Sequence, residues 1–219
     1  MPRQKKRNKL VLGVTGSFAS GKSSVARILK GRGVEIIDAD KLAHACLRPG
    51  HSCHRRIKAH FGATGRKKLG EIVFNDRSEL KKLNSIIHPE VIRQIKSRIA
   101  RSRAEIIILD APLLIEAGLK NIVDKLIVVS ITGKERIKRL RLRSGLKSSQ
   151  IMKRLKAQIP LSAKLRAADF IIDNSGTLDE TRKQVRKIAQ QVLPRRVGKE
   201  WAAREQICFA NLRRKLWKN

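Results

Sequence analysis

The segment from Gly16 to Ser23 constrains the fold of this chain more than any other feature of the sequence. It reads GSFASGKS, with a glycine on each side of a four-residue spacer, then lysine and serine. Such glycines let the backbone N–H groups converge on a phosphate, while the lysine reaches the β- and γ-phosphates and the hydroxyl binds Mg²⁺. An apolar run at 10–15 precedes the segment and a helical pattern at 22–30 follows it. We therefore expect a phosphate-binding loop between the first strand and the first helix of an α/β domain.

Short apolar runs alternate with helical stretches along the rest of the chain. This alternation favours βαβ units and a parallel sheet. Between the second and third strands lies a long, mostly helical region, about 41–103, which Pro89 punctuates. An acceptor-binding subdomain fits there. The five expected strands are Leu10–Thr15, Val34–Asp38, Glu105–Asp110, Leu126–Ile131 and Phe170–Asp173.

The remaining helices are expected after the fourth strand. Residues 133–168 read as helices rich in Lys and Arg, and Thr177–Val192 reads as the last helix of the domain, ended by Pro194. Residues 199–217 fit one more amphipathic helix. Its apolar face would carry Trp201, Cys208, Leu212 and Leu216.

The charge of the chain is extreme, at +33 for 219 residues. Residues 3–9 contribute +5 and residues 195–219 contribute +6, so most of the excess lies in the body of the chain. Such a chain attracts polyanions, including nucleotides, CoA-like molecules and nucleic acid. A generally basic, solvated surface explains the charge as well as a selected nucleic-acid role does, and both interpretations stay open.

Cysteine usage and hydropathy favour a cytoplasmic protein. The three cysteines form no CxxC pair, and their odd number does not suggest a disulfide framework. No run of eighteen apolar residues is present, so no membrane span is expected. The apolar run after the basic N-terminus, at 10–12, is too short for a signal peptide.

Five residues of types that can bind metal, three His and two Cys, lie within eleven residues. Their spacing fits no familiar zinc pattern, so we expect ordinary helix and loop residues rather than a metal site. The five are His44, Cys46, His51, Cys53 and His54.

Two carboxylates, Asp38 and Asp40, stand at the end of the second expected strand. A carboxylate there points toward the ligand crevice of an open parallel sheet and can accept the proton of an attacking hydroxyl. The alternative is a structural role, with Asp40 as the N-cap of a following helix. Beside a phosphate loop, the catalytic interpretation is favoured for Asp38.

Arginines supply the charge that stabilises a transferred phosphoryl group. Residues 134–156 hold ten Lys or Arg and one acid, and most of these are expected on solvated helix faces. Arg143 stands before Ser144 and Gly145, where a helix would break into a mobile lid, so it is the first choice for a catalytic arginine.

Six blocks of the sequence resemble dephospho-CoA kinase, in the right order, and the resemblance runs from about 10 to 193. The blocks are Thr15–Ser24, Val34–Asp40, Leu83–Pro89, Asp110–Glu116, Arg154–Gln158 and Ala168–Gly176.

The resemblance implies a P-loop NTPase fold of the nucleoside-monophosphate-kinase-like class, with a five-stranded parallel core. It implies transfer of the γ-phosphate of ATP to the 3′-hydroxyl of dephospho-CoA, the last step of CoA synthesis, with Mg²⁺ as cofactor. The resemblance divides the chain into a basic extension at 1–9, a kinase domain at 10–193 and a basic extension at 194–219. Within the kinase domain, it implies an acceptor-binding insertion at about 41–103 and a lid at about 133–168.

The resemblance also implies roles for individual residues. Asp38 would be the base, Arg143 the lid arginine, Lys22 a catalytic cation and Ser23 the Mg²⁺ ligand. The ATP site would comprise Gly16, Ser17, Phe18, Ala19, Ser20, Gly21, Lys22, Ser23, Ser24 and Asn174. The acceptor site would comprise Asp38, His88, Pro112, Leu113 and Leu114.

The chain departs from the family pattern at Ser17–Phe18, at Ser144 and in a shortened segment at 61–66. Two alternatives compete with the kinase interpretation. A P-loop kinase for another small acceptor would lack the blocks around His88 and Pro112–Leu114. A nucleic-acid-associated ATPase would require aromatic stacking platforms, which a chain without Tyr supplies poorly. Weak, non-specific RNA binding through the basic surface is compatible with the kinase interpretation.

Overall fold

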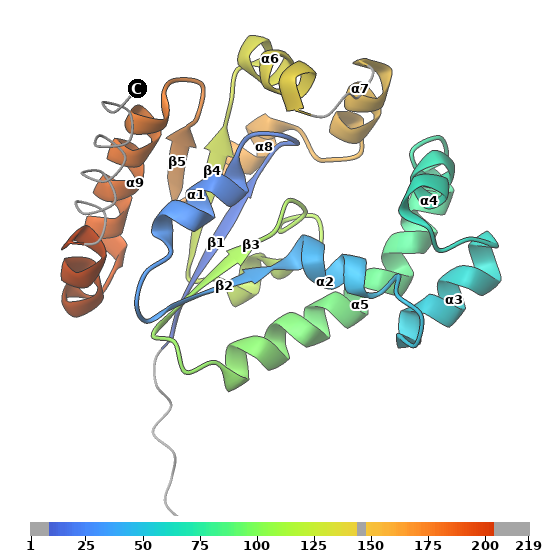
Figure 1. Cartoon of the computed structure of the whole chain (residues 1–219), viewed down its shortest axis with the longest axis horizontal. Coiled ribbons are helices and arrows are strands. Elements are labelled where there is room, and N and C mark those ends of the chain that lie inside the picture. Colours follow the sequence, from blue (N-terminus) through green and yellow to red (C-terminus); the bar gives the residue numbers. More distant parts are fainter. Residues whose placement is uncertain (1–8, 144–147, 204–219) are drawn as a thin grey trace, which may run out of the picture.

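A computed structural model describes residues 9–143 and 148–203 of the chain. Five parallel strands form one sheet in the order β2-β3-β1-β4-β5 (Figure 1). This arrangement confirms the predicted α/β class, and each predicted strand boundary lies within one residue of the observed one. The strands are β1 (Leu10–Gly16), β2 (Val34–Asp38), β3 (Ile106–Asp110), β4 (Lys125–Ser130) and β5 (Phe170–Asp173).

Helices cover both faces of the sheet and form the insertion that extends to one side of it (Figure 1). None of the helices in the described ranges is both long enough and apolar enough to cross a membrane. The helices are α1 (Lys22–Leu29), α2 (Ala39–Ala45), α3 (Ser52–Phe61), α4 (Arg66–Val73), α5 (Arg77–Arg101), α6 (Gly133–Arg143), α7 (Ser148–Lys156), α8 (Leu161–Arg166) and α9 (Leu178–Val192), with a 3₁₀ turn η1 at Leu119–Ile122.

The side chains of β3 alternate between two hydrophobic cores. Ile107 and Leu109 belong to the core beneath α2, α3 and α5, whereas Ile106 and Ile108 belong to the core beneath α1 and α9. Successive side chains of a strand point to opposite faces of its sheet, so a strand covered on both faces is apolar throughout. This explains why β3 is an uninterrupted aliphatic run.

Pro89 lies inside α5 and does not interrupt the insertion. A proline in a helix interior removes one backbone donor, which usually breaks or kinks the helix. Here the helix is buried on both sides of the proline, at Ile86 and Ile87 before it and at Val91 and Ile95 after it. This burial favours a continuous helix, so the interruption that was expected at Pro89 is absent.

The chain beyond α9 packs against the domain. Residues 195–203 are helical, four residues earlier than the predicted start at 199. Val197 and Trp201 are buried in the core beneath α1, and the Trp201 indole donates a hydrogen bond of 3.0 Å to the carbonyl of Ile28. Trp201 is therefore on a buried face, as expected. Cys208, Leu212 and Leu216 lie outside the described residues.

Candidate active site

The loop between β1 and α1 has the geometry of a phosphate cradle. Gly21 takes a left-handed backbone conformation, with φ of 89°, and an added Cβ would clash with the side-chain amide of Asn174. At Gly16 an added Cβ would clash with the carbonyl of Val129 on β4. No side chain caps the N-terminus of α1, so this helix end can receive an anion.

Side chains from distant elements fix this loop. The Asn174 amide donates a 2.8 Å hydrogen bond to the carbonyl of Ser20, and Thr181 on α9 donates to the other end of the same amide, also at 2.8 Å. Asn174 is buried. Asn174, predicted as part of the ATP site, therefore also has a structural role, because it holds the loop in place.

Two residues from the lid region also reach the loop. Arg136 on α6 donates a 2.8 Å hydrogen bond to the hydroxyl of Ser17, and Gln158 after α7 accepts one of 2.9 Å from the backbone N–H of Phe18. Arg136 was not among the predicted site residues, because ten basic residues in one stretch look alike in sequence. Its position beside the loop places a guanidinium near the phosphate site.

Two carboxylates meet where β2 and β3 end. Asp38 and Asp110 are direct register partners on adjacent strands. Asp110 is buried, and one of its oxygens has no hydrogen-bond partner among the described residues. Burial raises the pKa of Asp110, a hydrogen bond with Ser23 and the charge of Lys22 lower it, and Asp38 raises it further. The carboxylate thus lies beside Ser23 and Lys22, the loop residues that the sequence predicts to bind metal and phosphate.

Asp110 was missed as a site residue. It stood in one of the blocks that resemble the family, but no role was assigned to it. The pattern that identified Asp38 also applies to Asp110, because both are acidic residues at the carboxyl end of a strand in the sheet that carries the phosphate loop.

Asp38 is itself the N-cap of α2. One of its carboxylate oxygens accepts a 3.0 Å hydrogen bond from the backbone N–H of Lys41, so the cap is Asp38 rather than the Asp40 of the structural alternative. The capping role goes to Asp38 because the helix starts one residue after the strand ends. The other oxygen lies 4.0 Å from the Lys41 ammonium.

A cavity of about 1400 Å³ opens from the loop into the helical insertion. At one end it is lined by loop residues, including Lys22 and Ser23, and by Asn174. At the other end it reaches α4 and α5, with Lys67 and Asn84 in its wall. Ligand sites commonly measure 300–1000 Å³, so this space suits two substrates that meet end to end.

The predicted acceptor residues divide into two groups. Pro112 and Leu113 line the cavity. Leu114 belongs to the hydrophobic core instead, and His88 on α5 is outside the described lining. Burial lowers the pKa of His88, against an opposing effect of Glu116, so the imidazole is held neutral.

A buried lysine supports the wall at Pro112. Lys164 on α8 is fully buried, and its ammonium donates to the carbonyl of Pro112 at 2.7 Å and to Glu116 at 2.9 Å. Glu116 also accepts from the backbone N–H of Ile159, between α7 and α8. Lys164 was not predicted, since a buried lysine cannot be told from a surface one in a chain this basic.

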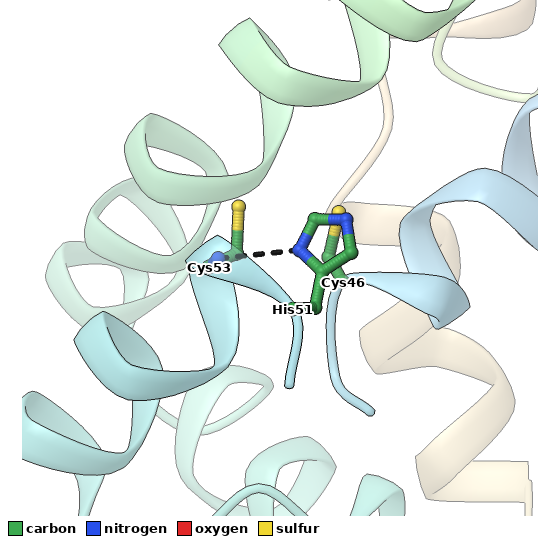
Figure 2. Close-up of side chains that lie close together, drawn as sticks. All are labelled: Cys46, His51 and Cys53. Atoms are coloured by element: carbon green, nitrogen blue, oxygen red, sulfur yellow. Dashed lines mark hydrogen bonds between the residues drawn. The ribbon is translucent and has the colours of Figure 1, made fainter. Parts of the chain in front are cut away.

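The side chain of Arg143, the predicted lid arginine, lies outside the described residues, as do Ser144 and Gly145. Arg139, one helical turn earlier, lines the cavity and donates a 3.2 Å hydrogen bond to the carbonyl of Gly176. The histidine and cysteine cluster also divides. Cys46, His51 and Cys53 come together at the corner between α2 and α3 (Figure 2), while His44 lines the cavity.

Comparison with known proteins agrees with this geometry. A family model described as dephospho-CoA kinase matches residues 10–180. The chain belongs to the dephospho-CoA kinase family. It is 42% identical over 192 residues to the dephospho-CoA kinase of Carboxydothermus hydrogenoformans, across 83% of this chain and 93% of that one.

Two solved structures are similar to this chain over most of its length. The crystal structure of TT1252 from Thermus thermophilus has a TM-score of 0.74 and 30% identity, covering 85% of this chain and 99% of that one. The dephospho-CoA kinase from Campylobacter jejuni has a TM-score of 0.57 and 31% identity, covering 83% and 96%. Membership of the dephospho-CoA kinase family confirms the resemblance and the prediction of a phosphotransferase with a P-loop kinase fold.

Proposed function

We propose that this chain transfers the γ-phosphate of ATP to the 3′-hydroxyl of the ribose of dephospho-CoA, giving CoA and ADP. The observation that carries the proposal is the continuous cavity, which has the phosphate loop at one end and the helical insertion at the other. Phosphoryl transfer requires little covalent chemistry from the protein, and catalysis depends on positioning the two substrates and stabilising charge.

We assign the Mg²⁺ of this reaction to Ser23 and Asp110. Mg²⁺ prefers hard oxygen ligands, and these residues offer a hydroxyl and a carboxylate that lie next to one another. The buried oxygen of Asp110 that lacks a described partner is the kind of group that a cation satisfies. When bound there, Mg²⁺ would neutralise negative charge that develops on the transferred phosphoryl group.

Asp38 is the proposed base. One of its oxygens is held by the cap of α2, which fixes the carboxylate, and the other is available to accept the proton of the 3′-hydroxyl. Lys22 supplies positive charge at the β- and γ-phosphates, and Arg143 is proposed to add charge from the lid. Arg136 supports the same end of the site through Ser17.

The acceptor is proposed to lie along Pro112 and Leu113. Thr15 and Lys164 both donate to the carbonyl of Pro112, at 3.2 and 2.7 Å, and so tie this wall to the strand that carries the phosphate loop. The adenine of ATP is assigned to the stretch from Asn174 to Gly176, both of which line the cavity.

An acceptor panel tests the proposal. ATP consumption is measured with dephospho-CoA, adenosine and simple nucleosides, each with Mg²⁺. Only dephospho-CoA is expected to support rapid consumption. Equal rates with another acceptor would favour the alternative of a different small-molecule kinase, and RNA-stimulated hydrolysis without any acceptor would favour the nucleic-acid ATPase.

A further inference from the structure

Three side chains of the insertion form a compact group that the phosphoryl-transfer site does not use. Each of Cys46, His51 and Cys53 offers one ligand atom, and these atoms all lie within 4.8 Å of one another. Figure 2 shows the imidazole beside both cysteines, at the corner where the chain passes from α2 to α3. Both cysteines are buried, and His51 is 19% exposed.

The separations suit a zinc ion. Tetrahedral zinc lies about 2.3 Å from thiolate sulfur and about 2.0–2.1 Å from imidazole nitrogen, which puts its ligand atoms about 3.6–3.8 Å apart. Atoms already within 4.8 Å of one another therefore need to approach by at most about 1.2 Å. Rotation of the three side chains can supply such a shift.

One hydrogen bond fixes the tautomer of His51. The Nδ1 atom accepts from the backbone N–H of Cys53 at 3.2 Å, so Nδ1 carries the lone pair, and a zinc ion bound at Nδ1 takes the place of this hydrogen bond. The Nε2 atom lies 3.8 Å from a carboxylate oxygen of Glu90 and 3.2 Å from the amide of Gln94. A carboxylate on the far side of a ligating histidine is a recurrent feature of zinc sites, because it fixes the tautomer and the ring orientation.

The positions of the two cysteines in their helices also fit a bound cation. Cys46 is the C-cap of α2, where the partial negative charge of a helix end favours a cation. Cys53 is in the first turn of α3, where the N–H groups favour a thiolate. Zinc displaces the thiol protons when it binds, and the resulting two thiolates and one imidazole select zinc over hard cations such as Mg²⁺.

We propose that Cys46, His51 and Cys53 bind one zinc ion. Water occupies the fourth coordination position of the ion, on the side of the partly exposed His51. Because Asp38 caps the N-terminus of α2 and Cys46 caps its C-terminus, the ion fixes the far end of the helix that Asp38 caps. Leu47, next to Cys46, lines the cavity, so the ion also braces the cavity wall.

The direct test measures metal in the full-length protein. Chain purified with reductant and dialysed should contain about one zinc per chain by mass spectrometry. Cys46→Ser, Cys53→Ser and His51→Ala should each lower this to near zero. His54→Ala, one residue beyond Cys53, and Cys208→Ser are matched controls that should keep the metal.

A second measurement separates loss of binding from loss of folding. A chelator first removes the metal from the wild-type chain. Titration with Co²⁺ should then produce a thiolate-to-cobalt charge-transfer band, and added zinc should abolish this band by displacing the cobalt. In Glu90→Gln the stoichiometry should be kept while zinc affinity falls about 10–100-fold, as expected for a residue that only orients a ligand.

Three results would overturn the proposal. The first is the absence of zinc together with the absence of a cobalt charge-transfer band in the reduced wild-type chain. The second is zinc whose amount is unchanged in all three variants. The third is a Cys46–Cys53 disulfide in the purified chain that, once reduced, still binds no metal, which would identify the pair as a redox element instead.

Discussion

At the residue scale, the site depends on two neighbouring carboxylates with different surroundings. Asp110 is buried beside Ser23, whereas Asp38 has 28% of its side chain exposed. One environment suits a metal ligand and the other a base that must reach a substrate hydroxyl. Groups with distinct environments on adjacent strand ends can therefore hold distinct roles in one reaction.

Asp38→Asn separates the base from the cap. Asparagine caps a helix about as well as aspartate, so the thermal stability should change little. Turnover should fall about 10²–10⁴-fold, the usual contribution of a positioned base, while the Kd for ATP stays close to that of the wild type. Steady-state kinetics, ATP titration and a melting curve test this. A variant whose only defect is weak ATP binding would exclude the role of base.

Asp110→Asn should stabilise the metal-free protein and remove activity. Because the folded pKa of Asp110 is raised, the folded state keeps its proton to higher pH than the unfolded state. The free energy of unfolding therefore falls as pH rises from the unfolded-state pKa to the folded-state pKa, and the cost is fully present above the folded-state pKa. The amide removes that cost.

The Tm at pH 7 should therefore rise, and for a chain of this size each 1 kcal/mol of relieved cost corresponds to about 2–4 °C. Mg²⁺-dependent turnover should be lost in the same variant. Melting curves from pH 4 to pH 8 test the predicted stabilisation, since the difference in Tm between the variant and the wild type should increase with pH. A variant less stable than wild type at pH 7 would contradict the account.

At the element scale, the sequence predicted the parts whose signals are local. The strand at 106–110 was visible as an aliphatic run, and the loop at 16–23 as a motif between a strand and a helix. The continuity of α5 through Pro89 was not visible, because packing on both sides of the proline outweighs its local preference.

Contacts between distant elements were also beyond sequence reasoning. The burial of Lys164 depends on Glu116 and on the carbonyl of Pro112, some fifty residues away. The approach of Cys46 to His51 and Cys53 depends on the turn between α2 and α3, which the unfamiliar spacing did not reveal. Both features require the three-dimensional path of the chain.

The helix after Pro194 should matter for stability although it lies beyond the predicted kinase domain at 10–193. Removing residues 194–219 deletes the buried Trp201 and Val197, and loss of a buried Trp side chain alone costs about 3–5 kcal/mol. Removing only residues 204–219 keeps this packing. Denaturant unfolding should show a clear loss of unfolding free energy when residues 194–219 are removed. The loss should be smaller when only residues 204–219 are removed.

Equal stability of the two truncated chains would show that the Trp201 contact contributes little. Kinase activity measured well below the melting temperature is the accompanying control, since neither truncation removes a proposed site residue. We expect both to retain turnover under those conditions.

At the scale of the whole molecule, a net charge of +33 should act on the approach of polyanionic substrates. Added salt screens long-range attraction, so the KM for ATP and dephospho-CoA should rise more than turnover falls. Mixed RNA should bind weakly, with an affinity that falls steeply with salt, and should not stimulate turnover. Steady-state kinetics over a salt series, with and without RNA, measure these effects. A flat KM with RNA-accelerated ATP hydrolysis would contradict this expectation.

The position of the transferred phosphate tests the central claim most directly. Dephospho-CoA, ATP and Mg²⁺ are incubated with the full chain, and the product is analysed by phosphorus NMR and mass spectrometry, with Lys22→Ala as the matched inactive control. The account predicts one new phosphate on the 3′-oxygen of the ribose, formed in proportion to ADP and absent with Lys22→Ala. ADP without a phosphorylated acceptor, or a phosphate on another oxygen, would contradict it.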